Sequence, residues 1–187
     1  LRRPGFSLAS TVMSTRKHPR TDTAYFVTTT VRGRCAVLRE PRAAALLLKV
    51  ISTVRSELSF ALLAYSVMPD HLHLVLAPDH GEDLPKIMQL IKGRFARAWN
   101  SDTERRGSLW QARFYETAIR TDAQLRSCLE YVDWNAVKAG LAESPEAYPY
   151  SSAGRDEETD LEDYLVGGLW TGDTGLKPGL PKEVPVI

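Results

Sequence analysis

The sequence contains few cysteines, and the two that it has lie far apart. Cys35 and Cys128 are the only ones among 187 residues, and they form no C-x-x-C motif. This argues against a disulfide framework or a cysteine-based structural zinc site. No apolar run reaches the roughly 20 residues that a membrane-spanning helix needs. The N-terminus also lacks the apolar core of a signal peptide. We therefore expect a cytoplasmic protein.

The net charge is too small to indicate a partner, because it is only +1. The distribution of charge is uneven: the first twenty residues are basic, whereas residues 156–163 are acidic. We expect residues 1–22 to be a disordered basic segment, residues 23–153 to form one domain, and residues 154–187 to be a tail. Met13 and the four residues after it look like a normal start, so Leu1 to Val12 are left out of the fold prediction.

The remaining chain alternates between β-branched runs and amphipathic helical patterns. Strands are predicted at 25–31, 60–67, 71–77 and 114–119, and helices at 41–58, 83–100 and 122–138. The order β-α-β-β-α-β followed by an extra helix predicts an α+β, ferredoxin-like split βαβ fold. In this fold an antiparallel sheet carries two helices on one face. We expect the third helix to cover the open face.

Two helices have patterns specific enough to predict their buried faces and ends. For the second helix we expect a buried stripe of Leu84, Ile87, Ile91, Phe95 and Ala98. For the third helix we expect Asp122 as the N-cap and Gly140 as the C-terminal stop.

The segment from Val67 to Leu76 holds two histidines separated by one leucine. Residues two apart on a strand project from the same face, so His71 and His73 should point together while Leu72 and Leu74 face the core. Two converging imidazoles can hold a divalent metal ion. Two ordinary surface histidines on a half-buried strand would give the same pattern.

The third helix carries polar groups beside its apolar stripe. At about 100° per residue, its apolar residues share one stripe: Leu125, Leu129, Val132 and Ala136. The polar residues fall together on one edge beside it: Gln124, Tyr131, Asn135 and Lys138. This edge is either a polar site or a solvated helix margin with a half-buried tyrosine.

Several ordered motifs together resemble the REP-associated tyrosine transposases, a group of HUH (His-hydrophobic-His) single-stranded DNA transposases. The matching segments are 65–73, 109–114, 131–140 and 148–152, and they place the resemblance over about residues 24–153. This chain departs from the family at Ala136, where proline is usual, and at Asp70, where asparagine is common.

The resemblance implies that Tyr131 is the nucleophile. It would attack a phosphodiester of single-stranded DNA and form a 5′-phosphotyrosine, which conserves the bond energy for rejoining. The resemblance also implies that His71, His73 and Asn135 bind Mg²⁺ or Mn²⁺, which would polarise the phosphate. A hairpin at a palindromic repeat would be the substrate, and the protein would be nucleoid-associated, either as a monomer or as a homodimer.

Charged and aromatic residues near these motifs are candidates for DNA contacts, since single strands are bound by both kinds of side chain. The DNA-binding candidates are Arg94, Arg97, Arg113, Lys138 and Trp110. Arg105, Arg106, Trp99 and Phe114 are weaker ones. Tyr115 is a rival nucleophile that could instead be packed or stack on a base, and His80 could be a further ligand.

Two other functions remain open at this point. The chain could be a non-catalytic single-stranded nucleic-acid-binding protein derived from a transposase. It could also be a metal phosphoesterase that uses water, and such an enzyme would not need Tyr131.

Overall fold

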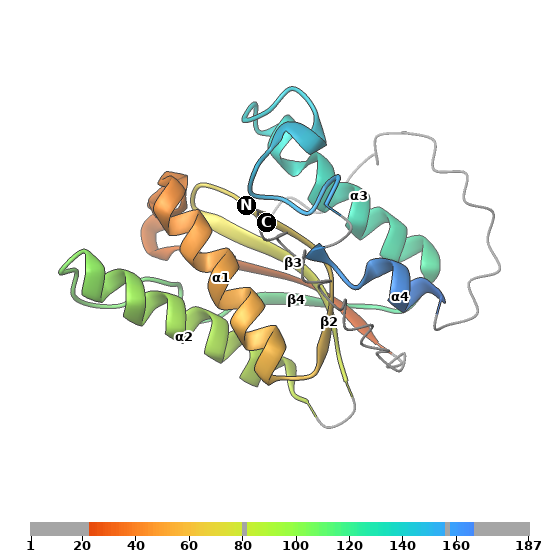
Figure 1. The fold of residues 1–187 in the computed structure, drawn as a ribbon, viewed down its shortest axis with the longest axis horizontal. Coiled ribbons are helices and arrows are strands. Elements are labelled where there is room, and N and C mark those ends of the chain that lie inside the picture. Colours follow the sequence, from red (N-terminus) through yellow and green to blue (C-terminus); the bar gives the residue numbers. More distant parts are fainter. Residues whose placement is uncertain (1–22, 80–81, 156–157, 167–187) are drawn as a thin grey trace, which may run out of the picture.

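The computed structural model describes residues 23–79, 82–155 and 158–166, which form an antiparallel sheet between two helical layers (Figure 1). The strands are β1 (Ala24–Thr30), β2 (Phe60–Val67), β3 (His71–Pro78) and β4 (Tyr115–Ile119). Their order in the sheet is β2-β3-β1-β4, and each neighbouring pair is antiparallel. This arrangement confirms the predicted ferredoxin-like fold.

The long helices lie on both faces of the sheet, as the sequence predicted. Helices α1 (Pro41–Glu57) and α2 (Leu84–Asp102) cover one face, and α3 (Asp122–Lys138) lies across the other with the short α4 (Leu161–Val166) (Figure 1). Short 3₁₀ turns occur at Arg32–Arg34, Val37–Arg39 and Pro145–Ala147. None of the helices in the described part of the chain is long and apolar enough to cross a membrane.

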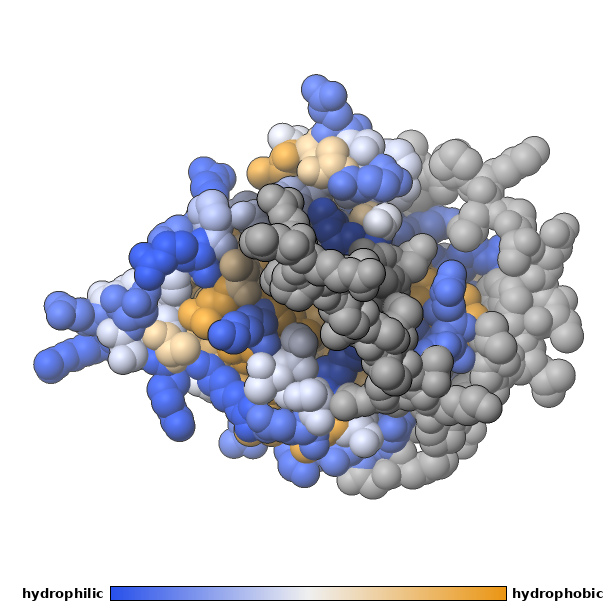
Figure 2. Space-filling model, viewed as in Figure 1, coloured by the Kyte–Doolittle hydropathy of each residue, from blue (hydrophilic) through white to orange (hydrophobic). Residues whose placement is uncertain are grey.

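Alternation along β3 divides its side chains between the two layers. Leu72 and Leu74 are fully buried in the cluster that α1 and α2 form with the sheet, whereas Val75 belongs to the cluster on the α3 side. His73 also faces α3, since its ring contacts Tyr131. The outer surface of the α1 and α2 layer is mostly hydrophilic (Figure 2), as expected for amphipathic helices.

Two details of the helices differ from the sequence prediction. Trp99, at 6% exposure, completes the buried stripe of α2 in place of the exposed Ala98. The N-cap of α3 is Thr121 rather than Asp122, because the Thr121 side chain accepts a hydrogen bond from the Gln124 backbone N–H at 3.2 Å. Gly140 follows α3 with φ +67°, which fits the predicted stop.

The packed domain extends beyond residue 153, where the predicted tail was to begin. Arg155 donates its backbone N–H to the Ser152 carbonyl, and Asp160 donates its own to the Leu62 carbonyl of β2. Tyr164 of α4 is buried in the cluster on the α3 side. The expectations for residues 1–22 and 167–187 fall outside the described residues.

Candidate active site

His71 and His73 converge on the face of the sheet that α3 covers. They are alternate residues of β3, and their Nε2 atoms lie 3.0 Å apart with the ring planes 80° to each other. The sequence therefore predicted this pair correctly. The two residues are not an ordinary surface pair, because His73 is only 3% exposed.

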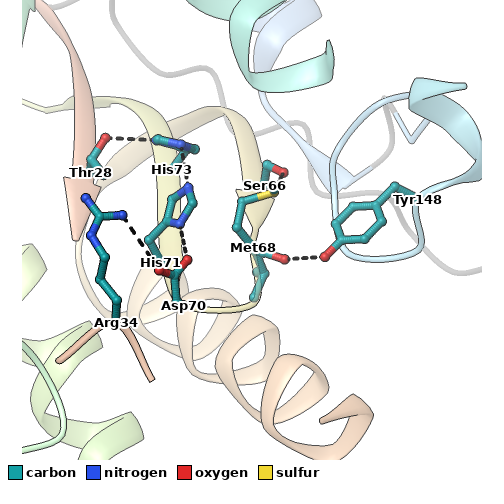
Figure 3. Close-up of polar contacts among 9 residues, drawn as sticks. Thr28, Arg34, Ser66, Met68, Asp70, His71, His73 and Tyr148 are labelled. Atoms are coloured by element: carbon teal, nitrogen blue, oxygen red, sulfur yellow. Dashed lines mark hydrogen bonds and ion pairs between the residues drawn. The ribbon is translucent and has the colours of Figure 1, made fainter. Parts of the chain in front are cut away.

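Each histidine has a partner on its other ring nitrogen. Asp70 Oδ1 lies 2.6 Å from His71 Nδ1, and Thr28 Oγ1 lies 2.8 Å from His73 Nδ1. Arg34 pairs with Asp70 at 3.7 Å, so these groups form one continuous line of contacts (Figure 3). Such partners fix the orientation of both rings and leave the two Nε2 atoms facing each other.

The surroundings of His73 favour its neutral form. Burial, and to a lesser degree the neighbouring His71, lower the pKa of His73 to about 3. His73 is therefore neutral at physiological pH, which is the form that binds metal ions.

Helix α3 brings Tyr131 against His73 within the same chain. Their ring centroids are 5.3 Å apart in an edge-to-face arrangement. Phe26 of β1 holds both rings, since it stacks on His73 at 5.4 Å and meets Tyr131 edge-on at 5.6 Å. Val132 next to Tyr131 is fully buried. The position of Tyr131 is therefore set by the packing of the whole helix.

Two other residues from the polar edge of α3 accompany Tyr131. Lys138 is exposed, and its Nζ lies 5.5 Å from the centre of the Tyr131 ring. Asn135 lies one helical turn after Tyr131 and is half-buried. Gln124 instead caps the preceding turn by accepting the Arg120 backbone N–H at 2.8 Å.

The residues present fit a divalent cation. Two nitrogen ligands at right angles, each about 2.1 Å from a metal ion, would lie about 3.0 Å apart. The separation of the two Nε2 atoms matches this value. Among the described residues, no third His, Cys, Asp or Glu forms a metal-binding cluster with them. Further ligands would therefore be an amide oxygen, water or substrate phosphate.

Three of the other four DNA-binding candidates lie across the sheet from the histidine pair or inside the core. Arg94 and Arg97 are on α2, across the sheet from the site, and Arg94 is paired with Glu57 at 2.7 Å. Trp110 is 4% exposed and donates its indole N–H to the Lys92 carbonyl at 3.0 Å, so its ring is not free to stack on a base. Arg113 is exposed in the loop before β4.

The weaker candidates divide in the same way. Trp99 belongs to the core, and Phe114 is partly buried against it, which argues against the expected stacking roles. Arg105 is half-buried, Arg106 is exposed, and both follow α2. Tyr115 is 45% exposed on β4. His80 lies outside the described residues.

Sequence reasoning missed Thr28 and Phe26 as parts of the site, and it treated Asp70 only as a mild departure from the family outside the ligand set. The alternation in β1 puts Phe26 and Thr28 on one face, which was a usable signal. Their pairing with β3, in which Thr28 lies opposite His73, joins segments 45 residues apart that no local pattern connects.

With this geometry in view, the comparisons with known proteins identify the class. The family model described as "Transposase IS200 like" matches residues 20–135, well over half of the chain. The chain belongs to the IS200-like transposase family.

Individual relatives narrow this to one group. A protein of Haemophilus influenzae, provisionally named as a REP-associated tyrosine transposase, is 32% identical over 130 residues, covering 63% of this chain and 70% of the relative. The REP-associated tyrosine transposase of Escherichia coli is 29% identical over 150 residues, covering 80% and 85%. The chain is thus a member of the REP-associated tyrosine transposases, which are DNA transposases.

A solved structure supports this placement. The structure of a REP-associated tyrosine transposase bound to a REP hairpin matches with a TM-score of 0.64 and 26% sequence identity. The match covers 91% of this chain and 98% of that one.

Proposed function

We propose that this protein is a metal-dependent transposase that cleaves and rejoins single-stranded DNA at hairpins of palindromic repeats through a 5′-phosphotyrosine on Tyr131. The observation that carries the proposal is the contact between Tyr131 and His73, whose Nε2 meets that of His71. The relative solved with a REP hairpin supports the substrate class.

Tyr131 would act by direct attack on the scissile phosphate. The phenol oxygen forms a bond to phosphorus, the bond from phosphorus to the 3′-oxygen breaks, and the phenolic proton passes to solvent while the leaving 3′-oxygen gains one. The reverse attack by a 3′-hydroxyl rejoins the strand, so neither direction needs an external energy source. A phenol is a weak nucleophile at neutral pH because it stays protonated.

The histidine pair would offset this weakness. With Asn135 as a third ligand, His71 and His73 would hold Mg²⁺ or Mn²⁺. The bound ion would polarise a non-bridging phosphate oxygen and lower the barrier to attack. Lys138 beside the Tyr131 ring would add positive charge where the phosphate must lie.

Cleavage of a hairpin oligonucleotide tests the proposal. We expect wild-type protein with Mn²⁺ to cleave a hairpin with single-stranded flanks, and His71→Ala to lose cleavage while still binding the hairpin at fixed salt. Arg97→Ala, on the opposite face, is the matched control and should cleave normally. Unchanged cleavage by His71→Ala would show that His71 does not hold a metal ion needed for cleavage.

The same assay separates the two alternative functions. A non-catalytic binding protein would bind the hairpin without cleaving it under any metal condition. A water-using phosphoesterase would keep cleaving after Tyr131→Phe. The direct contact between a tyrosine and the histidine pair favours the transposase, since neither alternative needs that tyrosine.

A further inference from the structure

Tyr115 lies on the same face of the sheet as the histidine pair. In the antiparallel register Tyr115 is opposite Thr28, and Thr28 is opposite His73. Residues that are directly opposite in an antiparallel sheet project from the same face. Two strand spacings separate β4 from β3, which places Tyr115 about 10 Å from His73 across the sheet.

The Tyr115 ring is open to solvent, whereas His73 and Phe26 on the same face are buried. Among the described residues, the large apolar side chains left exposed are those of Tyr115, at 45%, and Leu141, at 38%. Phe26, in the next row of the same face, is buried against Tyr131. On β4 the covered part of the face includes Ile119 but not Tyr115, so an aromatic ring remains exposed at the end of β4 nearer the site.

The loop before Tyr115 is tied to β1 and α2 by hydrogen bonds. The Gln111 backbone N–H bonds to the Thr30 carbonyl, and strand pairing resumes at Tyr115 opposite Thr28. Lys92 Nζ of α2 donates to three carbonyls of this loop at 2.9, 3.4 and 3.5 Å. The carbonyls belong to Gln111, Ala112 and Arg113.

Phe114 and Tyr115 project to opposite faces of the sheet. Phe114 packs against the core on the α1 and α2 side, where Lys92 Nζ lies 5.9 Å from its ring centre. Tyr115 is directed to the other face by the register with Thr28. The register therefore fixes the face of the sheet to which the Tyr115 side chain projects.

The chemistry of this surface fits a nucleic-acid base. Single-stranded DNA is bound by stacking its bases on aromatic side chains beside cationic groups. Arg113 is exposed two residues before Tyr115 and supplies the cation. Tyr131 contacts His73 directly, whereas Thr28 lies between Tyr115 and His73 in the sheet. Tyr115 is therefore placed for binding DNA rather than for attack on the phosphate.

We propose that Tyr115 is the stacking platform for a base of the single-stranded segment that flanks the reacting phosphate. This inference rests on the proposed function. It adds a recognition residue and places the flanking strand across β1 toward β4.

Equilibrium binding to uncleaved DNA tests it. The probes are a labelled hairpin with a single-stranded flank, a series with one flank base at a time replaced by an abasic site, and the hairpin without a flank. Proteins are compared in the Tyr131→Phe background, which prevents cleavage. Tyr115→Ala should weaken binding of the flanked hairpin roughly 5- to 100-fold. Tyr115→Phe, which keeps the ring, and Leu141→Ala, which removes the other exposed apolar side chain, should bind like their parent.

The abasic series locates the stacked base. Removing one particular base should weaken binding by the parent protein, and Tyr115→Ala should add nothing further on that probe, as expected for one shared interaction. Tyr115→Thr, which suits a strand, repeats the test if Tyr115→Ala does not fold.

Four outcomes would overturn the proposal. These are an unchanged affinity of both Tyr115→Ala and Tyr115→Thr, an equal loss on every probe, a loss in Tyr115→Phe as large as in Tyr115→Ala, or a change of oligomeric state without a change in affinity. The last would mean that Tyr115 belongs to a protein interface at the β4 edge. If the parent Tyr131→Phe protein bound no hairpin at all, the proposed function itself would be wrong.

Discussion

At the scale of single residues, the histidine pair depends on the groups behind it. Asp70 and Thr28 each engage one Nδ1 atom, so both rings are aimed by hydrogen bonds rather than by packing alone. A neutral His71 that donates from Nδ1 to Asp70 has a free lone pair on Nε2. This is the arrangement that metal-binding histidines adopt with a carboxylate partner.

Asp70 should therefore matter for metal affinity. We expect Asp70→Ala to weaken Mn²⁺ binding by about 10-fold or more, because outer partners of ligands typically contribute 10- to 100-fold. Asp70→Asn keeps an acceptor and should lose less. Titration calorimetry with Mn²⁺ measures this without any reaction. Arg34→Ala is the control, since Arg34 touches only the far side of Asp70 and is well exposed. Equal affinity for Asp70→Ala and wild type would refute the role.

Among these residues, some contacts could be predicted from the sequence and others could not. The pairing of His71 with His73 follows from the two-residue repeat of any strand, so it was predictable. The Thr28 contact requires the β1–β3 register, which no local pattern encodes. The burial of Trp110 could not be predicted, because no local pattern around it indicates that it packs against Lys92 and Phe95.

At the scale of elements, α3 is the structure that makes the site. Its apolar stripe packs on the sheet through Leu125 and Val132, while Ala136 packs against Met68 and Tyr148. This packing places Tyr131 against His73. The stripe and its neighbouring polar edge were predicted from the helical repeat. The predicted N-cap of α3 was wrong by one residue, because Thr121 and Asp122 are both good caps and only the backbone conformation decides between them.

Stability of α3 should respond to this cap. Thr121→Ala should lower the free energy of unfolding by about 1 kcal/mol, since the Gln124 N–H loses its acceptor. Thr121→Ser keeps a hydroxyl and should stay close to wild type. Urea denaturation monitored by circular dichroism gives both values, and equal stability of Thr121→Ala and Thr121→Ser would contradict the assignment.

Strand β2 shows why element boundaries were easier to predict than details. Its bounds match the apolar run of the sequence, Phe60–Val67. An irregularity between Leu62 and Ala64 puts Leu63 and Ala64 in the same cluster. A continuously apolar strand does not reveal such a bulge, because both of its faces are buried and every register looks alike.

At the scale of the whole molecule, the segment after residue 150 closes the outer edge of β2. Asp160 accepts the Leu62 backbone N–H at 2.9 Å and pairs with Arg55 of α1, whose Nη1 also donates to the Glu158 carbonyl at 2.8 Å. Acidic residues without helical or strand periodicity had suggested a tail. Their partners are a distant arginine and a strand edge, which only the folded chain brings together.

Removing this ion pair should destabilise the domain strongly. Asp160 is 6% exposed, so Asp160→Ala leaves Arg55 and a buried backbone N–H without this partner. We expect a loss of about 3 kcal/mol in the free energy of unfolding. Asp102→Ala breaks the exposed pair with Arg42 and should cost less than about 1 kcal/mol. Similar losses for the two variants would show that the segment after residue 150 contributes little.

We propose that the active site is assembled within a single chain, because His73 and Tyr131 are in contact within the chain. We therefore expect no recovery of cleavage when His71→Ala and Tyr131→Phe proteins are mixed, since each chain lacks one half of its own site. Recovered cleavage would mean that two chains exchange their helices and share sites.

Tyr131 is the group that we propose becomes covalently linked to DNA. Wild-type protein should be incubated with Mn²⁺ and a flanked hairpin oligonucleotide, and any covalent adduct should be mapped by mass spectrometry. We predict a phosphotyrosyl peptide containing Tyr131, an undiminished adduct in Tyr115→Phe, and no adduct in Tyr131→Phe. An adduct that persists in Tyr131→Phe, or one that maps to Tyr115, would contradict the proposed role of Tyr131 as the nucleophile.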